Sequence, residues 1–142
     1  MWYNYEMGMF DNFEIDYPLP IEEWIPIQYR TYAYHTFAAD GFQTKDLECL
    51  LDYYYIDNNG NLFKNTQSSW FESPSKNDEY KKIYFHGHIN VYTSVWIDYE
   101  DDYNKGPMLW FEYDLKFTDG LLVRATMLSP TKEDVDELHR NL

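Results

Sequence analysis

The strongest fold signal in the chain is MLWFEYDLKFTDGLLVRATML, which spans residues 108–128. Along its first ten residues, apolar and polar side chains alternate, as they do in a strand with one buried face. Asp119-Gly120 is a two-residue turn signal, and the apolar run after it predicts a second strand. The stretch therefore predicts an antiparallel β-hairpin. Its predicted inward side chains are Phe111, Tyr113, Leu115 and Phe117, and its outward ones are Trp110, Glu112, Asp114 and Lys116.

Two stretches before it continue the pattern of strands. Residues 82–96, KIYFHGHINVYTSVW, alternate in the same way and predict a long strand. Residues 53–64 predict another hairpin, because YYYI favours a strand and DNNG supplies turn residues. Residues 47–54 have helical spacing, so a short helical turn is expected to give way to the strand at about Tyr53. The inward side chains of the long strand are predicted to be Ile83, Phe85, Gly87, Ile89 and Val91.

The amino-terminal third is predicted to be extended. Residues 18–26, PLPIEEWIP, hold three of the six prolines and predict a strap that wraps the domain, anchored by Trp24. Residues 28–37, QYRTYAYHTF, alternate and predict a first strand, although neither of its faces is cleanly apolar.

The carboxyl-terminal stretch, residues 129–142, predicts a helix. Ser129 is expected to cap it and Pro130 to take its first position, while acidic residues fill the first turn. Val135, Leu138 and Leu142 form a narrow apolar stripe, so this helix is expected to pack on the sheet.

Together these segments predict a single α+β domain over residues 1–142. It is expected to be predominantly antiparallel β, a meander or small sandwich built from hairpins, with a C-terminal helix packed on the sheet. Residues 1–41 form the extended aromatic and proline-containing segment and first strand, 42–128 the hairpin core, and 129–142 the helix. A chain of this length is long enough for one core.

Charge narrows the classes of partner. The chain has 25 Asp and Glu against 11 Lys and Arg, for a net charge of −14, and 20% of its residues are aromatic. Such a surface repels nucleic acids and anionic membranes and attracts basic proteins. We therefore expect no direct binding to nucleic acid or membrane, and a basic protein as the partner. The oligomeric state is not predicted.

The cellular compartment is predicted from the amino terminus and the single cysteine. Residues 1–16, MWYNYEMGMFDNFEID, contain no basic region and no uninterrupted apolar run of a signal peptide. Cys49 has no second cysteine with which to form a disulfide, which suits a reducing compartment. The expected location is the cytoplasm.

An acidic run, WIDYEDDYNKG at residues 96–106, is the main candidate binding site. In an extended chain its alternate carboxylates would be spaced about 6.5 to 7 Å apart, close to the repeat of phosphates along a nucleic-acid strand. Such a row can occupy the basic groove of a nucleic-acid-binding protein. The alternative is a solvated loop between two strands. The residues predicted to bind the partner are Asp98, Glu100, Asp101, Asp102, Glu112 and Asp114.

A pair of histidines is the candidate for a metal site. On a strand, His86 and His88 point the same way and could converge on a metal if another strand supplied a third ligand. No further residue with ligand spacing stands out, and the alternative is two exposed or tyrosine-stacked histidines. The sequence also lacks the motifs of nucleophilic, phosphate-binding and zinc-dependent enzymes. We therefore predict no catalytic residues, no metal and no cofactor.

Several motifs along the chain form a recognisable series. They are MGMFD (7–11), YPLP (17–20), FQTKDLECLLDYYYIDNNGNL (42–62), HGHINVY (86–92) and WFEYDLKFTDGLL (110–122). This series resembles a recurring pattern in a family of small uncharacterised bacteriophage and prophage proteins. The chain departs from that pattern by six residues before Met7 and by a long interval at residues 21–41. The resemblance implies a phage or prophage setting, hence the host cytoplasm, and supplies no catalytic residues.

Three functions are consistent with these observations. The leading hypothesis is a small acidic phage or prophage protein that is not an enzyme and acts by binding. It would inhibit a host nucleic-acid-handling or defence protein through an acidic, aromatic surface that acts as a nucleic-acid mimic. The alternatives are a metal-assisted enzyme that uses His86 and His88, and a structural or assembly module.

Overall fold

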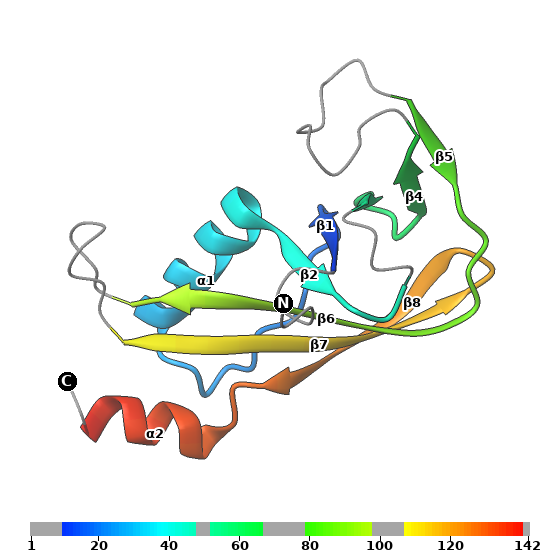
Figure 1. The fold of residues 1–142 in the computed structure, drawn as a ribbon. Coiled ribbons are helices and arrows are strands. Elements are labelled where there is room, and N and C mark those ends of the chain that lie inside the picture. Colours follow the sequence, from blue (N-terminus) through cyan, green and yellow to red (C-terminus); the bar gives the residue numbers. More distant parts are fainter. Residues whose placement is uncertain (1–9, 48–51, 67–78, 98–106, 141–142) are drawn as a thin grey trace, which may run out of the picture.

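The computed structural model describes residues 10–47, 52–66, 79–97 and 107–140. Within these residues, eight strands form one sheet and two helices accompany it (Figure 1). The strands are β1 (Asp11–Ile15), β2 (Phe42–Thr44), β3 (Tyr53–Ile56), β4 (Leu62–Asn65), β5 (Tyr80–Lys82), β6 (Gly87–Trp96), β7 (Met108–Thr118) and β8 (Leu121–Ser129). The helices are α1 (Ile27–Asp40) and α2 (Lys132–Arg140). Neither is long and apolar enough to cross a membrane.

The order of strands in the sheet is β5-β4-β3-β1-β2-β6-β7-β8. Among the described strands, β1 and β3 are the parallel pair and the other neighbours are antiparallel. The predictions of an α+β fold, mostly antiparallel strands and a C-terminal helix are therefore confirmed. The prediction of a meander or a small sandwich of hairpins is wrong, because β1 lies inside the sheet with β2 on one side and β3 on the other.

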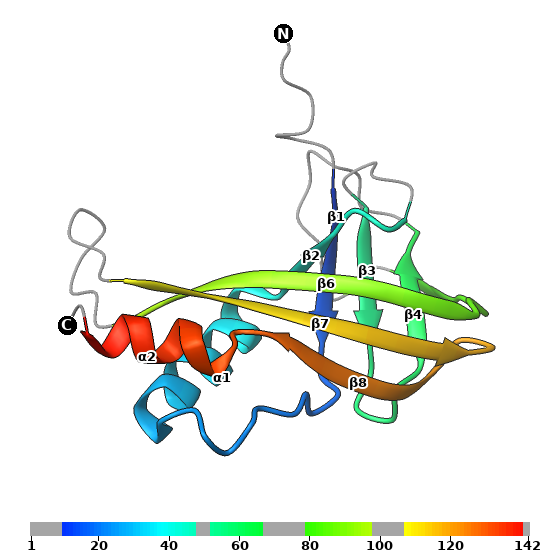
Figure 2. The same cartoon turned by 90° about the horizontal axis from the view of Figure 1, so that it is seen from below.

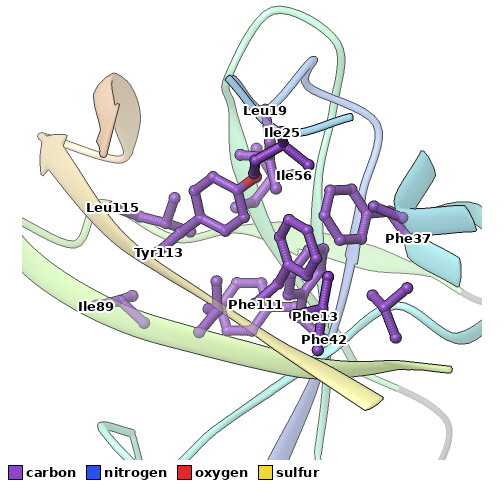
Figure 3. Close-up of a cluster of buried hydrophobic side chains, with 14 of the residues drawn as sticks. Phe13, Leu19, Ile25, Phe37, Phe42, Ile56, Ile89, Phe111, Tyr113 and Leu115 are labelled. Atoms are coloured by element: carbon purple, nitrogen blue, oxygen red, sulfur yellow. The ribbon is translucent and has the colours of Figure 1, made fainter. Parts of the chain in front are cut away.

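The sheet is strongly twisted, and its two halves enclose the core. Figure 2 shows β1, β3 and β4 running crosswise to β6, β7 and β8. Hydrogen bonds join the two halves at one corner, from the Leu62 amide to the Gly120 carbonyl (3.0 Å) and from the Leu122 amide to the Gly60 carbonyl (2.8 Å). Side chains from both halves and from α1 fill the space between them (Figure 3). Among them are Phe13, Phe37, Phe42, Ile56, Ile89, Phe111 and Tyr113.

The hairpin that the sequence signalled most strongly is confirmed. All four predicted inward side chains of β7 are fully buried. Asp119 and Gly120 both have positive φ, 49° and 82°, as a type I′ turn requires. The long strand before it is confirmed in part, since Ile89 and Val91 are buried as predicted. Its start is not at residue 82, because β6 begins at Gly87, whose φ is 134°.

The segment predicted as the first strand, residues 28–37, is instead part of α1, so this prediction is wrong. The helical period places Tyr29, Ala33 and Phe37 in one row, and these are the buried residues of the helix. The small Ala33 lets the helix lie close to the core, and the two aromatic rings fill the space on either side. Packing against the rest of the fold has therefore overridden the β propensity of tyrosine and threonine.

The proline-containing strap before α1 is anchored by residues other than the one predicted. Trp24 is 39% exposed, whereas Leu19 and Ile25 are buried. The buried Tyr113 hydroxyl also donates a hydrogen bond to the Pro20 carbonyl at 2.7 Å. A buried hydroxyl needs such a partner, and the strap supplies it.

The C-terminal helix begins two residues later than predicted. Thr131 caps it, because its hydroxyl accepts from the Asp134 amide (3.2 Å) and its own amide donates to the Asp134 carboxylate (2.9 Å). This is a capping box with aspartate in place of glutamate. Ser129 instead donates to the Trp110 carbonyl at 2.7 Å. Val135 and Leu138 are buried as predicted, while Leu142 lies outside the described residues.

Candidate functional site on the open face of β6 and β7

Strand alternation sends one set of side chains from β6 and β7 away from the core. The register pairs these residues directly across the two strands: Asn90 with Asp114, Tyr92 with Glu112, and Ser94 with Trp110. Partners of this kind lie side by side on one face of a sheet. We call the following group the open face: His88, Asn90, Tyr92, Trp110, Glu112 and Asp114.

An aromatic stack forms one end of the open face. The rings of Tyr92 and Trp110 are 5.0 Å apart with an interplanar angle of 20°. The Trp110 indole nitrogen donates to Glu112 Oε1 at 3.0 Å, and the side chain remains 39% exposed. The stack and the hydrogen bond fix the orientation of the indole, so its free surface is already arranged for a contact.

Three carboxylates surround Asn90 beside this stack. The Asn90 side-chain amide donates to Glu112 Oε2 at 2.8 Å, and its backbone amide donates to Asp46 Oδ2 at 2.6 Å. Asp114 lies opposite Asn90 in the register, and its Oδ2 is 2.8 Å from His88 Nδ1. Each carboxylate oxygen can accept more than one hydrogen bond, so capacity remains for an external donor.

The segment after β2 is tied to β6 through side chains. In the register of β2 and β6, Gln43 pairs with Tyr92. Beyond that pair, the Thr44 hydroxyl donates to the Asn90 carbonyl at 2.6 Å and also accepts from the Asp46 amide at 3.1 Å. Thr44 and Asp46 therefore hold both backbone groups of Asn90, which places the Asp46 carboxylate beside the open face.

The charge of this surface changes along the strands. Toward the tip of the β7–β8 hairpin, Lys116 lies between His88 on β6 and Arg124 on β8. Toward the start of β7 the surface carries Glu112, Asp114 and the aromatic stack. The acidic and aromatic end is thus the part that suits a cationic group.

A groove of about 300 Å³ continues from this end, between β7 and α2. The register of β7 with β8 ends at Glu112 and Ser129, so the beginning of β7 faces α2. Trp110 belongs both to the groove and to the open face. The groove therefore extends the candidate site past the edge of the sheet. Its lining residues are Met108, Leu109, Trp110, Asp134, Glu137 and Leu138.

The structure describes only two of the six residues that were predicted to bind the partner. Glu112 and Asp114 lie together on the open face, where strand alternation placed them. The other four predicted residues lie outside the described residues; they are Asp98, Glu100, Asp101 and Asp102. The residues that flank this acidic run are joined, because the Ile97 amide donates to the Pro107 carbonyl at 2.8 Å.

The two histidines occupy different environments. His86 is exposed and precedes β6, whereas His88 belongs to the strand and pairs with Asp114. In the described ranges, no three or more residues of the types His, Cys, Asp and Glu gather as a set of metal ligands.

Sequence reasoning missed Asp46 and the α2 carboxylates Asp134 and Glu137 as neighbours of this site. The short spacing of Thr44 and Asp46 was a signal of local hydrogen bonding, but it does not say which strand the pair will contact. No family model, curated protein or solved structure with which the chain was compared matches it. The proposed function therefore rests on the residues of this chain and on the resemblance of its motifs described above.

Proposed function

We propose that this protein acts by binding a basic protein and that the open face is its contact surface. The observation that carries the proposal is the exposed Trp110–Tyr92 stack, held directly beside Glu112 and Asp114 on a chain of net charge −14. Aromatic residues fixed in position are the usual anchors of protein interfaces. The surrounding carboxylates supply attraction and orientation for a positively charged partner.

The contact would use lysine and arginine side chains of the partner. Their aliphatic stems pack on the free surface of Trp110, and their cationic groups reach Glu112 and Asp114. A neighbouring side chain can enter the groove and meet Asp134 and Glu137. This combination of apolar and acidic contacts selects a basic protein surface over a neutral one.

The partner class follows from the charge and from the resemblance. Basic surfaces with exposed lysine and arginine are typical of proteins that bind nucleic acids. An acidic protein that covers such a surface excludes the nucleic acid, because both compete for the same cations. In a phage or prophage setting this corresponds to inhibition of a host nucleic-acid-handling or defence protein.

A displacement experiment tests this function. Bacterial lysate is bound to double-stranded DNA on a resin, and the purified protein is added at low salt. We expect it to release a defined set of DNA-bound proteins, and the release to weaken as salt rises. The double variant Glu112→Gln with Asp114→Asn is expected to need at least about tenfold more protein for the same release, a loss of about 1.4 kcal/mol.

The control variant is Glu133→Gln with Asp136→Asn, which removes the same charge from exposed positions of α2 that do not line the groove. It is expected to release the same proteins as the wild type at nearly the same concentration. Equal losses in the two variants would show that only total charge matters and would contradict the assignment to the open face. Release that does not depend on salt would contradict the electrostatic basis of the proposal.

A second candidate function, self-association, is favoured by the surface of β8. Leu121, Val123 and Leu128 are between 41% and 49% exposed on this strand, which is an edge of the described sheet. Exposed apolar residues on an edge strand favour pairing between chains. If this surface is used, the protein will sediment as a dimer at high concentration and Val123→Lys will return it to a monomer. A monomer at all concentrations removes this candidate.

A further inference from the structure

A second cavity lies away from the open face, where the last turn of α1 meets β1 and β3. Its volume is about 200 Å³. Two acidic residues, Glu14 on β1 and Asp40 on α1, line it together with Tyr53, Tyr54 and Tyr80. The α1 side is formed by small residues, among them Ala38 and Ala39, so the space between the helix end and the tyrosines stays open.

The carboxylate of Asp40 stands where a cation is favoured. Asp40 is the last residue of α1, and the final turn contains no basic residue. The C-terminal end of a helix carries partial negative charge, which attracts cations and repels carboxylates. A carboxylate at this position therefore makes the cavity more negative without stabilising the helix.

The carboxylate of Glu14 is also in an unfavourable environment. Glu14 is an exposed residue at the rim of the cavity, and partial desolvation together with the nearby Asp16 carboxylate raises its pKa. Asp16 is held in place by the Tyr55 hydroxyl, which donates to its Oδ2 at 2.7 Å, and Tyr55 lies opposite Glu14 in the register of β1 and β3. No lysine or arginine is among the described residues that line the cavity.

A basic side chain that contacts one of the lining tyrosines is already engaged. The Lys64 ammonium lies 5.9 Å from the centre of the Tyr54 ring and 3.4 Å from the Asp52 carboxylate. The Tyr54 ring is itself fixed by stacking on Phe13 at 5.3 Å. Among the described residues that line it, this aromatic and acidic cavity therefore has no cation of its own, and a cation from a partner can neutralise it.

Arginine suits this cavity better than lysine. The planar guanidinium stacks on aromatic rings, whereas an ammonium acts as a point charge. Its five donors can also reach two carboxylates from different elements at once. Each of the two carboxylates carries a charge at a position where that charge does not stabilise the fold. Positions of this kind tend to serve binding.

We propose that this cavity binds an arginine side chain of the partner protein, with the guanidinium between Glu14 and Asp40 and against the tyrosine rings. The source of the arginine rests on the proposed function, in which the partner is basic. The cavity itself is defined by residues separate from the open face. It would add a second point of attachment and so fix the orientation of the partner.

The test is a titration of the full chain, labelled with ¹⁵N, with N-acetyl-arginine amide. We expect saturable shifts of the Ala38, Ala39 and Gly41 amide signals, with a dissociation constant on the order of millimolar for so small a ligand. N-acetyl-citrulline amide, which has the same shape without the charge, is expected to produce no saturable shift. Equal responses to the two probes, or shifts elsewhere only, would overturn the proposal.

The variants Glu14→Gln and Asp40→Asn test whether the two carboxylates serve binding or stability. If they serve binding, affinity for arginine and stability should change in opposite directions. Each variant is expected to weaken arginine binding at least fivefold while raising the urea midpoint at pH 7. Because the pKa of Glu14 is raised in the folded state, ionisation of Glu14 destabilises the fold. The gain from Glu14→Gln is therefore present at neutral pH and disappears below pH 4.5, the ordinary pKa of this side chain. Lower stability at pH 7 in both variants would overturn the proposal.

Failure of the proposed arginine site can be distinguished from failure of the proposed function. If arginine amide binds but the protein releases nothing from DNA, the proposed function fails while the cavity assignment stands. If the protein releases basic proteins equally well with Glu14→Gln and Asp40→Asn, and arginine amide produces no shifts, the cavity assignment alone fails. The control variant Glu133→Gln with Asp136→Asn should leave arginine binding unchanged.

Discussion

Replacing Gly120 by alanine is expected to lower the free energy of unfolding by roughly 2–5 kcal/mol, the sum of backbone strain and overpacking. Gly120 has a φ of 82°, and a Cβ atom there would overlap the Ile83 carbonyl oxygen. Three hydrogen bonds hold its backbone in this position. Its amide donates to the Phe85 carbonyl (2.7 Å), and its carbonyl accepts from the Leu62 amide (3.0 Å) and the Lys82 ammonium (2.8 Å).

The preceding residue supplies a matched control for this prediction. Asp119 also has positive φ, 49°, but its side chain is exposed. Asp119 already carries a Cβ atom in this conformation, so Asp119→Ala should lose at most about 1 kcal/mol, the advantage of aspartate over alanine in the left-handed region. Urea unfolding of the two variants measures the difference that the close approach to Ile83 makes. If Gly120→Ala is no less stable than Asp119→Ala, the hairpin tip does not dock on the segment before β6 as described.

The accuracy of the sequence predictions depended on whether the deciding interactions were local. Alternation along β7 and the Asp119-Gly120 turn lie within 20 residues of one another, so this hairpin could be predicted. The position of β1 between β2 and β3 is set by pairing with strands that follow it far along the chain. No pattern within residues 11–15 signals that arrangement, so the hairpin meander was the simpler prediction.

The same distinction applies to the candidate site. Glu112 and Asp114 share a face because they are two residues apart on a strand, and this could be read from the sequence. Asp46 reaches the same surface because Thr44 and Asp46 bind the backbone of Asn90, 44 residues further along. The meeting of Glu14 with Asp40 likewise needs α1 to end beside β1. Contacts of this kind depend on the fold and have no local signature.

Phe37→Ala is expected to lower the free energy of unfolding by about 3–5 kcal/mol, the usual loss when a buried aromatic ring is removed. Phe37 is 8% exposed, and its ring projects from α1 into an aromatic cluster (Figure 3). Its ring centre is 4.8 Å from that of Phe42, 5.5 Å from Phe111 and 6.0 Å from Tyr113. Since a domain is stabilised by only about 5–15 kcal/mol in total, this variant should lose a large share of its stability.

A companion variant in the same segment distinguishes the helix from the predicted strand. In a strand, His35 and Phe37 share a face, so both replacements by alanine would disturb the core. In α1, His35 is exposed and Phe37 is buried. His35→Ala should therefore change stability by less than about 0.5 kcal/mol, while Phe37→Leu should lose less than Phe37→Ala because it retains part of the apolar volume. Large and equal losses in the His35 and Phe37 alanine variants, measured by urea unfolding, would contradict the helix, because only an alternating strand buries both positions.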